Sequence, residues 1–326
     1  MKHSYSKNQV CKLTAGAKIV GKWHRHPYKI VRVLGAGATG KVYLAESAKG
    51  LVALKVGTDS MSITSEVNVL KHFSKVQGVV LGPSLLDVDD LVTSEGTFPF
   101  YVMEYLKGTE LIEYMQNRGV EWLGILMVQL LGDLDRLHSA GWVFGDLKPD
   151  NVLVVGPPAR IRWLDVGGTT LIGRSIKEYT EFFDRGYWGL GSRKAEPSYD
   201  LFAVAMVMIN CAYPKRFEKK GEKTIVLLKQ SVDDKPLLRP YRDVIISALQ
   251  GKYDSAEAMR KEMVKAVSKS SSYKHLPVKA QKKMKKTKVA TTSDKKQKQS
   301  SYFVEIFLLC SFLLLIYILY LFGQMM

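Results

Sequence analysis

The stretch FGDLKPDN, residues 144–151, gathers the polar side chains that are best suited to joint chemistry. The apolar run VLVV follows at 152–155, so the polar residues are expected on one loop at the mouth of a hairpin. On such a loop Asp146 would orient a hydroxyl group and accept its proton, Lys148 would neutralise a moving phosphoryl group, and Asn151 would hold a metal ion.

A second acidic motif lies fourteen residues past Asn151, where Asp165-Val166-Gly167 ends the apolar stretch 161–164. Carboxylates suit Mg²⁺ ions that bridge phosphate groups. The pattern therefore predicts that Asp165 is a second metal ligand.

The glycine-rich segment GAGATG, residues 35–40, separates two expected strands at 28–33 and 41–45. A dinucleotide-binding turn needs a helix after its glycines, and a strand follows here. We therefore expect a glycine hairpin whose amides fold over phosphates, with Val42 covering an adenine ring.

Lys55 ends the apolar strand VALK, residues 52–55. It is either an edge lysine that extends into solvent or a lysine that points into a cleft and pairs with phosphate oxygens. The second role needs a carboxylate to hold the lysine in place, and Glu66 on an expected helix at 65–73 is the candidate partner.

The remaining periodicity separates strands from helices along the chain. Further strands are expected at 51–56 and 100–105, and helices at 122–138 and 199–211. The second of these helices is apolar nearly all round, as in the centre of a domain. The pattern predicts an α+β body with a β-rich and an α-rich lobe.

Taken in order, these motifs resemble the catalytic domain of the eukaryotic-like (Hanks-type) serine/threonine protein kinases over residues 28 to about 211. The resemblance implies the two-lobed protein-kinase fold, ATP and Mg²⁺ (or Mn²⁺) as cofactors, and protein substrates on Ser/Thr. It makes Asp146 and Lys148 catalytic, gives the metal to Asn151 and Asp165, and implies that Asp200 braces the catalytic loop.

The resemblance also implies a set of nucleotide contacts. The glycines cover the phosphates, Lys55 pairs with Glu66, and Met103 is the gatekeeper residue. The backbone of Glu104 and Leu106 contacts adenine, and the carboxylate of Glu110 reaches the ribose. The full set is Gly35, Gly37, Gly40, Val42, Ala53, Lys55, Glu66, Met103, Glu104, Leu106, Glu110 and Leu153.

Three positions depart from the family pattern. Phe144-Gly145 replaces the His-Arg before the catalytic Asp, Val166 replaces the Phe of D-F-G, and no A-P-E stands between Asp165 and Asp200. The missing Arg removes a cationic pocket for a phosphorylated loop. A pseudokinase scaffold that binds nucleotide and localises partners, or a small-molecule kinase of related fold, stays open as an alternative.

Charge is distributed unevenly over the 326 residues, whose formal net charge is +17. Residues 265–300 contain twelve lysines and one acidic residue and so contribute +11 to this net charge. The overall composition, 46% apolar and 24% charged, excludes a fully disordered chain. The three cysteines are too few and scattered for a disulfide framework or a zinc site, and no signal peptide is expected.

The C-terminal stretch 302–322 is apolar and lacks charge from 306 onward, which predicts one transmembrane helix rather than a buried core helix. The lysines before it place the catalytic body in the cytoplasm, on a single-pass protein of the cytoplasmic membrane. The expected domains are a basic leader (1–24), a kinase domain (25–264, with lobes 25–104 and 107–264), a disordered tether (265–300), the span (302–322) and an external tail (323–326).

Eight lysines form two clusters in this tether: Lys282, Lys283, Lys285, Lys286, Lys288, Lys295, Lys296 and Lys298. They either orient the span, attract anionic lipid, or bind DNA without sequence preference. We hypothesise that a polyanion such as DNA brings kinase domains together, as a possible homodimer, for autophosphorylation. The Phe-Gly-Asp loop at residues 144–146 and the short expected tail at 323–326 also resemble the corresponding parts of sporulation membrane kinases. This resemblance implies a spore-forming organism and a DNA-linked activity.

Overall fold

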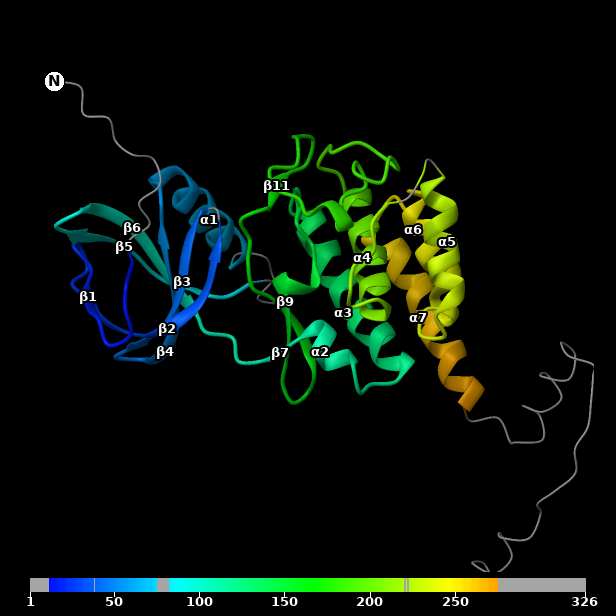
Figure 1. Cartoon of the computed structure of the whole chain (residues 1–326), viewed down its shortest axis with the longest axis horizontal. Helices are drawn as coiled ribbons and strands as arrows, with labels where there is room; N and C mark the ends of the chain where they lie inside the picture. Colours follow the sequence, from blue (N-terminus) through cyan, green and yellow to red (C-terminus); the bar gives the residue numbers. More distant parts are fainter. Residues whose placement is uncertain (1–11, 38, 75–81, 220, 222, 275–326) are drawn as a thin grey trace, which may run out of the picture. The chain divides into compact units, whose positions relative to one another are not determined.

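The computed structural model describes residues 12–37, 39–74, 82–219, 221 and 223–274. Its β-rich part is one antiparallel sheet in the order β1-β2-β3-β4-β6-β5, with helix α1 (Ser60–Phe73) beside it (Figure 1). The strands are β1 (Lys18–Val20), β2 (Pro27–Gly37), β3 (Gly40–Ser47), β4 (Gly50–Gly57), β5 (Leu85–Thr93) and β6 (Gly96–Glu104).

The second part is mainly helical and follows β6 in the chain (Figure 1). Its α-helices are α2 (Leu111–Met115), α3 (Val120–Ser139), α4 (Pro197–Ala212), α5 (Thr224–Asp234), α6 (Arg242–Leu249) and α7 (Ala256–Lys274). Its short strands are β7 (Thr109–Glu110), β8 (Trp142–Val143), β9 (Val152–Val155), β10 (Arg160–Trp163) and β11 (Thr170–Leu171). Three single 3₁₀ turns complete it: Pro149–Asn151, Glu181–Phe183 and Arg239–Tyr241.

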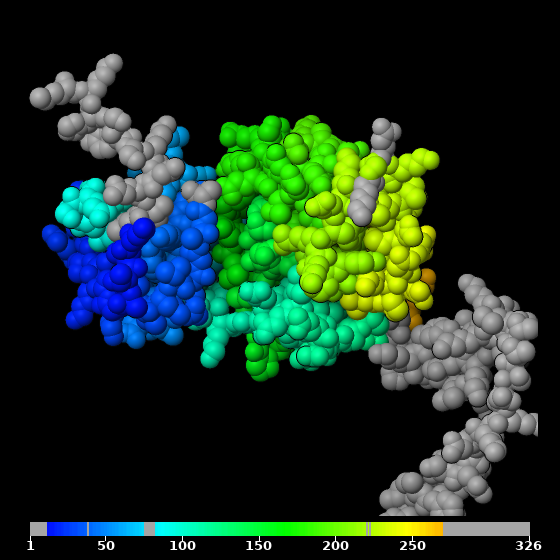
Figure 2. Space-filling model, in the orientation of Figure 1, coloured from blue at the N-terminus to red at the C-terminus, as the bar shows by residue number. Residues whose placement is uncertain are grey.

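The hydrophobic core has one cluster within the sheet and a larger one that joins the two parts. Apolar residues of β1 to β6 form the first, and the larger cluster includes α4, of which thirteen residues are buried, and extends to α1, β4 and β6. In the space-filling view the two parts form adjoining masses (Figure 2). The predicted α+β body with two lobes is confirmed, and α4 lies at the centre of its lobe because its surface is apolar on every side.

Local signals explain where several elements begin. Asp59 caps α1, since its carboxylate accepts a hydrogen bond of 2.8 Å from the amide of Ser62. Pro197 occupies the first turn of α4, where no intrahelical donor is needed. The hairpin of β2 and β3 closes at Gly40, whose φ is +155° and where a Cβ atom would lie 2.2 Å from the carbonyl oxygen of Val56.

Two predicted boundaries are wrong. The leader was placed at 1–24, but β1 pairs with β2 within it, so the folded part begins before residue 25. The tether is predicted from Lys265, but α7 continues to Lys274. Its inner face packs on α3, with Ala256, Met259 and Met263 buried before this boundary and Val267 against Gly124 after it. The polar composition after residue 264 concealed the end of this amphipathic helix.

The predicted span at 302–322 and the lysine clusters at 282–298 lie outside the described residues. Among the residues that are described, no helix combines the length and apolar character needed to cross a bilayer.

Candidate nucleotide and phosphotransfer site

A cavity of about 450 Å³ is bounded by the sheet on one side and by the helical part on the other. Eleven of the residues predicted from the sequence line it: Gly35, Val42, Ala53, Lys55, Met103, Glu104, Leu106, Glu110, Asn151, Leu153 and Asp165. Among these residues, the apolar side chains come from β3, β4, β6, the loop after β6, and β9. The polar ones come from β4, the end of β6, β7, the 3₁₀ turn at 149–151 and the loop after β10. The cavity therefore joins an apolar slot to a charged end.

Lys55 on β4 is buried and forms an ion pair with Glu66 on α1, in which its ammonium group contacts both carboxylate oxygens. Its Nζ lies 2.8 Å from Oε1 and 2.7 Å from Oε2 of Glu66. The predicted partner is thus correct. Helix α1 begins three residues after the end of β4, with no strand between them. The pair holds the ammonium group at the charged end of the cavity.

Tyr101 on β6 completes this pair and was not foreseen from the sequence. Its hydroxyl group donates a hydrogen bond of 2.8 Å to Oε2 of Glu66. Burial raises the pKa of Tyr101 well above its ordinary value, and the charge of Glu66 raises it further, so the hydroxyl group stays a donor. Only the pairing of β4 with β6, which sets Lys55 opposite Tyr101, reveals this contact.

Asp146 lies at the centre of a small hydrogen-bond network on the catalytic loop. Its carboxylate pairs with Nζ of Lys148, and its backbone carbonyl accepts 2.9 Å from Nδ2 of Asn151. The hydroxyl group of Thr180 donates to Asp146 at 3.1 Å and accepts from Lys148 at 3.1 Å. The three residues predicted from the loop are therefore together, and Thr180 joins them from a segment 34 residues away.

The backbone of this loop is anchored by Asp200 at the start of α4, as predicted. Its fully buried carboxylate accepts hydrogen bonds from the amides of Phe144 and Gly145 at 2.7 and 2.9 Å and lies 2.9 Å from Nε2 of His138. Gly145 has φ of +85°, and a Cβ atom there would lie 2.6 Å from the carbonyl oxygen of Gly168. This crowding explains why glycine is found at the position where the family pattern has arginine.

The donor set of Asn151 and Asp165 fits a divalent metal ion. The amide nitrogen of Asn151 is used toward Asp146, which leaves the amide oxygen as its ligand atom, and Asp165 offers a carboxylate to the cavity. Burial raises the pKa of the nearby Glu178 carboxyl, and the charges of Asp165, Asp146 and Glu66 raise it further. A divalent cation would relieve this accumulation of negative charge.

Five predicted residues do not line the cavity: Gly37, Gly40, Glu66, Asp146 and Lys148. Glu66 acts behind Lys55, and Gly37 and Gly40 pair with each other at the end of the β2–β3 hairpin. Asp146 and Lys148 contact Thr180 instead.

The segment that lacks the A-P-E motif is held by its own polar contacts. Arg185 pairs with Glu196 at 2.6 Å, and the buried Asp184 accepts from the amide of Tyr187, from Arg193 and from the hydroxyl group of Tyr199. These bonds tie the loop to the first turn of α4. The departure from the family motif therefore leaves an ordered loop beside Thr180.

We expect the substitution Thr180→Val to lower kcat roughly 10- to 100-fold, because a hydrogen bond to a charged group contributes about 1.5–3 kcal/mol. Valine keeps the shape but removes the hydroxyl group that bridges Asp146 and Lys148. Steady-state phosphotransfer assays measure the effect, and Thr180→Ser should restore most of the rate. An unchanged rate in Thr180→Val would show that the bridge has no catalytic role.

Comparison with known proteins agrees with this geometry. The family model described as protein kinase domain matches residues 28–265. The serine/threonine-protein kinase YabT of Bacillus subtilis is 54% identical over 272 residues, covering 83% of this chain and 80% of that protein. Serine/threonine-protein kinase PkaB of Streptomyces coelicolor is 29% identical over 133 residues, covering 39% of this chain and 31% of that protein.

Among solved structures, the kinase domain of Mycobacterium tuberculosis PknI shares the fold, with a TM-score of 0.55 and 19% identity. The match covers 79% of this chain and all of that one. With the site geometry, the family match and the YabT relative in agreement, the chain belongs to the protein kinase family, as a bacterial Hanks-type serine/threonine kinase.

Proposed function

We propose that this kinase transfers the terminal phosphoryl group of ATP to Ser/Thr hydroxyl groups of proteins, with Mg²⁺ (or Mn²⁺) held by Asn151 and Asp165. The observation that carries the proposal is the buried Lys55–Glu66 pair at the end of a cavity that both metal-ligand candidates line. A bound divalent ion would neutralise charge on the phosphates.

The apolar end of the cavity suits the adenine ring. Val42, Ala53 and Leu153 would enclose the base, with Met103 at the back. The backbone of Glu104 and Leu106 would bond the base edge, and Glu110 would reach the ribose. At the other end Lys55 would pair with phosphate oxygens under the amides of Gly35, Gly37 and Gly40.

Asp146 would orient the acceptor hydroxyl group and take its proton as the new oxygen–phosphorus bond forms. Lys148, already paired with Asp146, would stabilise negative charge on the transferring group. Thr180 would fix both side chains from the opposite segment. The carboxylate is thus oriented before the substrate arrives.

The direct test measures transfer from labelled ATP by the purified full chain, with Mg²⁺, to generic protein substrates and to itself. Label on serine and threonine, lost on chelation of the metal, is the expected result. Nucleotide binding without any transfer, equal to that of Asp146→Asn, would instead favour the pseudokinase scaffold. Transfer only to small hydroxyl compounds would favour a small-molecule kinase.

We also propose that residues 302–322 anchor the kinase in the cytoplasmic membrane, with the catalytic domain in the cytoplasm. The charge-free stretch from 306 and the lysines before it support this. Recovery of the full chain with membranes, and release of a chain truncated after residue 300, is the expected outcome. Equal recovery of both chains would contradict it.

The lysine-rich tether is proposed to bind a polyanion, DNA or anionic lipid, that gathers kinase domains for autophosphorylation. We expect DNA to raise autophosphorylation of the detergent-solubilised full chain at low salt and to lose this effect as salt increases, because binding releases counterions. Replacing the eight tether lysines with glutamine is the matched control. No response to DNA at low salt would remove DNA as the activator, and vesicles of anionic lipid test the other polyanion.

A further inference from the structure

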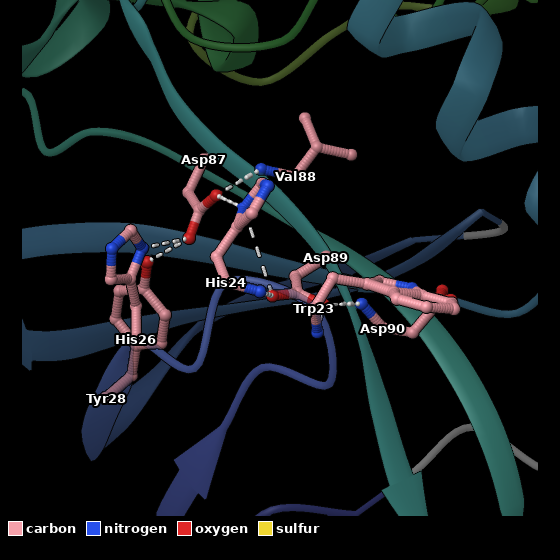
Figure 3. A network of polar contacts seen from close by, with 8 residues as sticks. All are labelled: Trp23, His24, His26, Tyr28, Asp87, Val88, Asp89 and Asp90. Carbon is pink, nitrogen blue, oxygen red and sulfur yellow. Dashed lines mark hydrogen bonds and ion pairs between the residues drawn. The ribbon is translucent and has the colours of Figure 1, made fainter.

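Residues 21–26, between β1 and β2, lie against the edge strand β5 (Figure 3). The amide of Lys22 donates 2.9 Å to the carbonyl oxygen of Asp90. The amides of Trp23 and His24 donate to the two oxygens of Asp89, each at 2.8 Å. The buried Asp89 therefore fixes the path of this loop, and its oxygens are already in use.

Two histidines of this loop point at one carboxylate of β5 (Figure 3). His24 Nδ1 lies 2.6 Å from Oδ1 of Asp87, and His26 Nδ1 lies 2.9 Å from Oδ2. The two nitrogens and a carboxylate oxygen all lie within 4.8 Å of one another. Three potential metal-ligand atoms thus converge from two segments that are 61 or more residues apart in sequence.

The surrounding contacts hold Asp87 in this orientation. Tyr28 donates its hydroxyl hydrogen to Oδ2 at 2.7 Å, and the amide of Val88 donates to Oδ1 at 2.9 Å. These two hydrogen bonds orient the carboxylate without depending on the histidines alone.

The loop backbone also has an unusual conformation between the two histidines. Arg25 has φ of +59°, and among the described residues no other non-glycine residue has a positive φ. Left-handed backbone is unfavourable for a residue with a Cβ atom and persists only where surrounding contacts impose it. Here those contacts bring the imidazoles of His24 and His26 to one carboxylate, with ring centroids 5.9 Å apart.

We propose that His24, His26 and Asp87 form a binding site for a zinc ion, separate from the nucleotide cavity. Two imidazole nitrogens and one carboxylate oxygen are a donor set that Zn²⁺ takes, with a water molecule in the fourth position. Mg²⁺ prefers oxygen ligands alone, so the catalytic cation does not compete well for this site.

Binding of the ion needs a rearrangement of the two rings. Tetrahedral Zn²⁺ with ligand bonds of about 2.0–2.1 Å separates its ligand atoms by roughly 3.3 Å, whereas the two Nδ1 atoms contact different oxygens of Asp87, at 2.6 and 2.9 Å, and the three candidate ligand atoms lie within 4.8 Å of one another. The side chains of His24 and His26 are 54% and 63% exposed, so the rings can turn toward a single oxygen. Each Nδ1 must be deprotonated to bind the ion, so the imidazole hydrogen must lie on Nε2, where it can donate a hydrogen bond to water.

A bound ion would join the loop of residues 21–26 to β5 more firmly than the hydrogen bonds do alone. Asp87 pairs with Val102 on β6, which directly precedes Met103 in the nucleotide cavity. The expected consequence is a higher thermal stability of the β-rich part, since a ligand that binds only the folded state stabilises it. Neither zinc binding nor this stabilisation depends on phosphotransfer.

The test uses the full chain in detergent, stripped of metal by a chelator that is then removed, with millimolar Mg²⁺ present throughout. Zinc titration followed by calorimetry should show one high-affinity site that the double variant His24→Asn, His26→Asn lacks. At 100-fold excess over the dissociation constant, zinc should raise Tm of the wild type by roughly 5 °C or more. Co²⁺ in place of zinc should give tetrahedral absorption bands that the double variant does not show.

His72→Asn is the matched control, because it removes an exposed histidine on α1 away from the loop. It should keep the stoichiometry, the Tm shift and the cobalt spectrum of the wild type. The circular dichroism and Mg²⁺-dependent activity of the double variant report whether it folds. Equal zinc stoichiometry and Tm shift in the wild type and the double variant, or no binding to either, would mean that the cluster is a set of structural hydrogen bonds only.

Discussion

The substitution Asp146→Asn is expected to lower kcat by about 10²- to 10⁴-fold while the KM for ATP stays close to that of the wild type. Asparagine cannot accept a proton at this position, and its amide loses the charge that pairs with Lys148. The loop itself should keep its shape, since Asp200 binds the amides of Phe144 and Gly145 independently of Asp146. Initial rates of phosphotransfer over a range of ATP concentrations measure both constants.

Asp243→Asn is a suitable control for this experiment, because it removes a carboxylate that is 96% exposed on α6, outside the site. It should leave both constants unchanged. If Asp146→Asn kept a rate within a few-fold of the wild type, Asp146 would not be the proton acceptor and the proposed arrangement of the site would have to be abandoned.

The second large effect is expected for Glu66→Gln, which breaks the buried ion pair with Lys55. Leaving a buried charge without its partner costs about 3–5 kcal/mol, which corresponds to a fall in Tm of roughly 6–15 °C. The ammonium group of Lys55 would also lose its orientation toward the phosphates, so kcat/KM should fall about 100-fold or more. Thermal unfolding and steady-state kinetics on the same preparation measure the two effects.

Tyr101→Phe separates the ion pair from its hydrogen-bond support. It removes the hydroxyl group that donates to Glu66 but leaves both charges in place. We expect a decrease in Tm smaller than that of Glu66→Gln and a decrease in kcat/KM of roughly 3- to 10-fold.

A Glu66→Gln variant that matched the wild type in both Tm and kcat/KM would mean that Lys55 needs no partner to bind phosphates.

Short motifs were enough to predict most of the candidate site. Lys55, Asp146, Asn151 and Asp165 each follow or precede an apolar strand in a local pattern, and strand and turn signals depend mainly on neighbouring residues. The partner of Lys55 could also be predicted, because Glu66 falls on the first helix after β4. Their nucleotide and metal roles stay predictions until they are tested.

Residues that reach the site from distant segments escaped this reasoning. Thr180 contacts Asp146 across 34 residues, and Tyr101 contacts Glu66 across 35. A threonine or tyrosine in isolation carries no pattern that names its partner. The pairing of β4 with β6 and the path of the chain from Gly167 to Thr180 create these contacts, and neither is encoded in a local motif.

The two misplaced boundaries have the same origin. Composition alone assigned residues 18–20 to a leader and residues 265–274 to a tether. In the structure residues 18–20 pair with β2, and α7 continues to Lys274 with Val267 against Gly124 of α3. Composition averages over a segment, while burial depends on which face of a helix or strand meets a neighbour.

The primary structure was thus sufficient for the chemistry within each loop, for the two-part α+β architecture and for the uneven charge, because these depend on residue type and short-range periodicity. Long-range packing was needed for the support of Glu66 by Tyr101, the bridge from Thr180 to Asp146, and the meeting of His24 and His26 with Asp87. In each case two segments far apart along the chain become neighbours only when the sheet and helices pack, and hydrogen bonds and metal coordination act over a few ångströms.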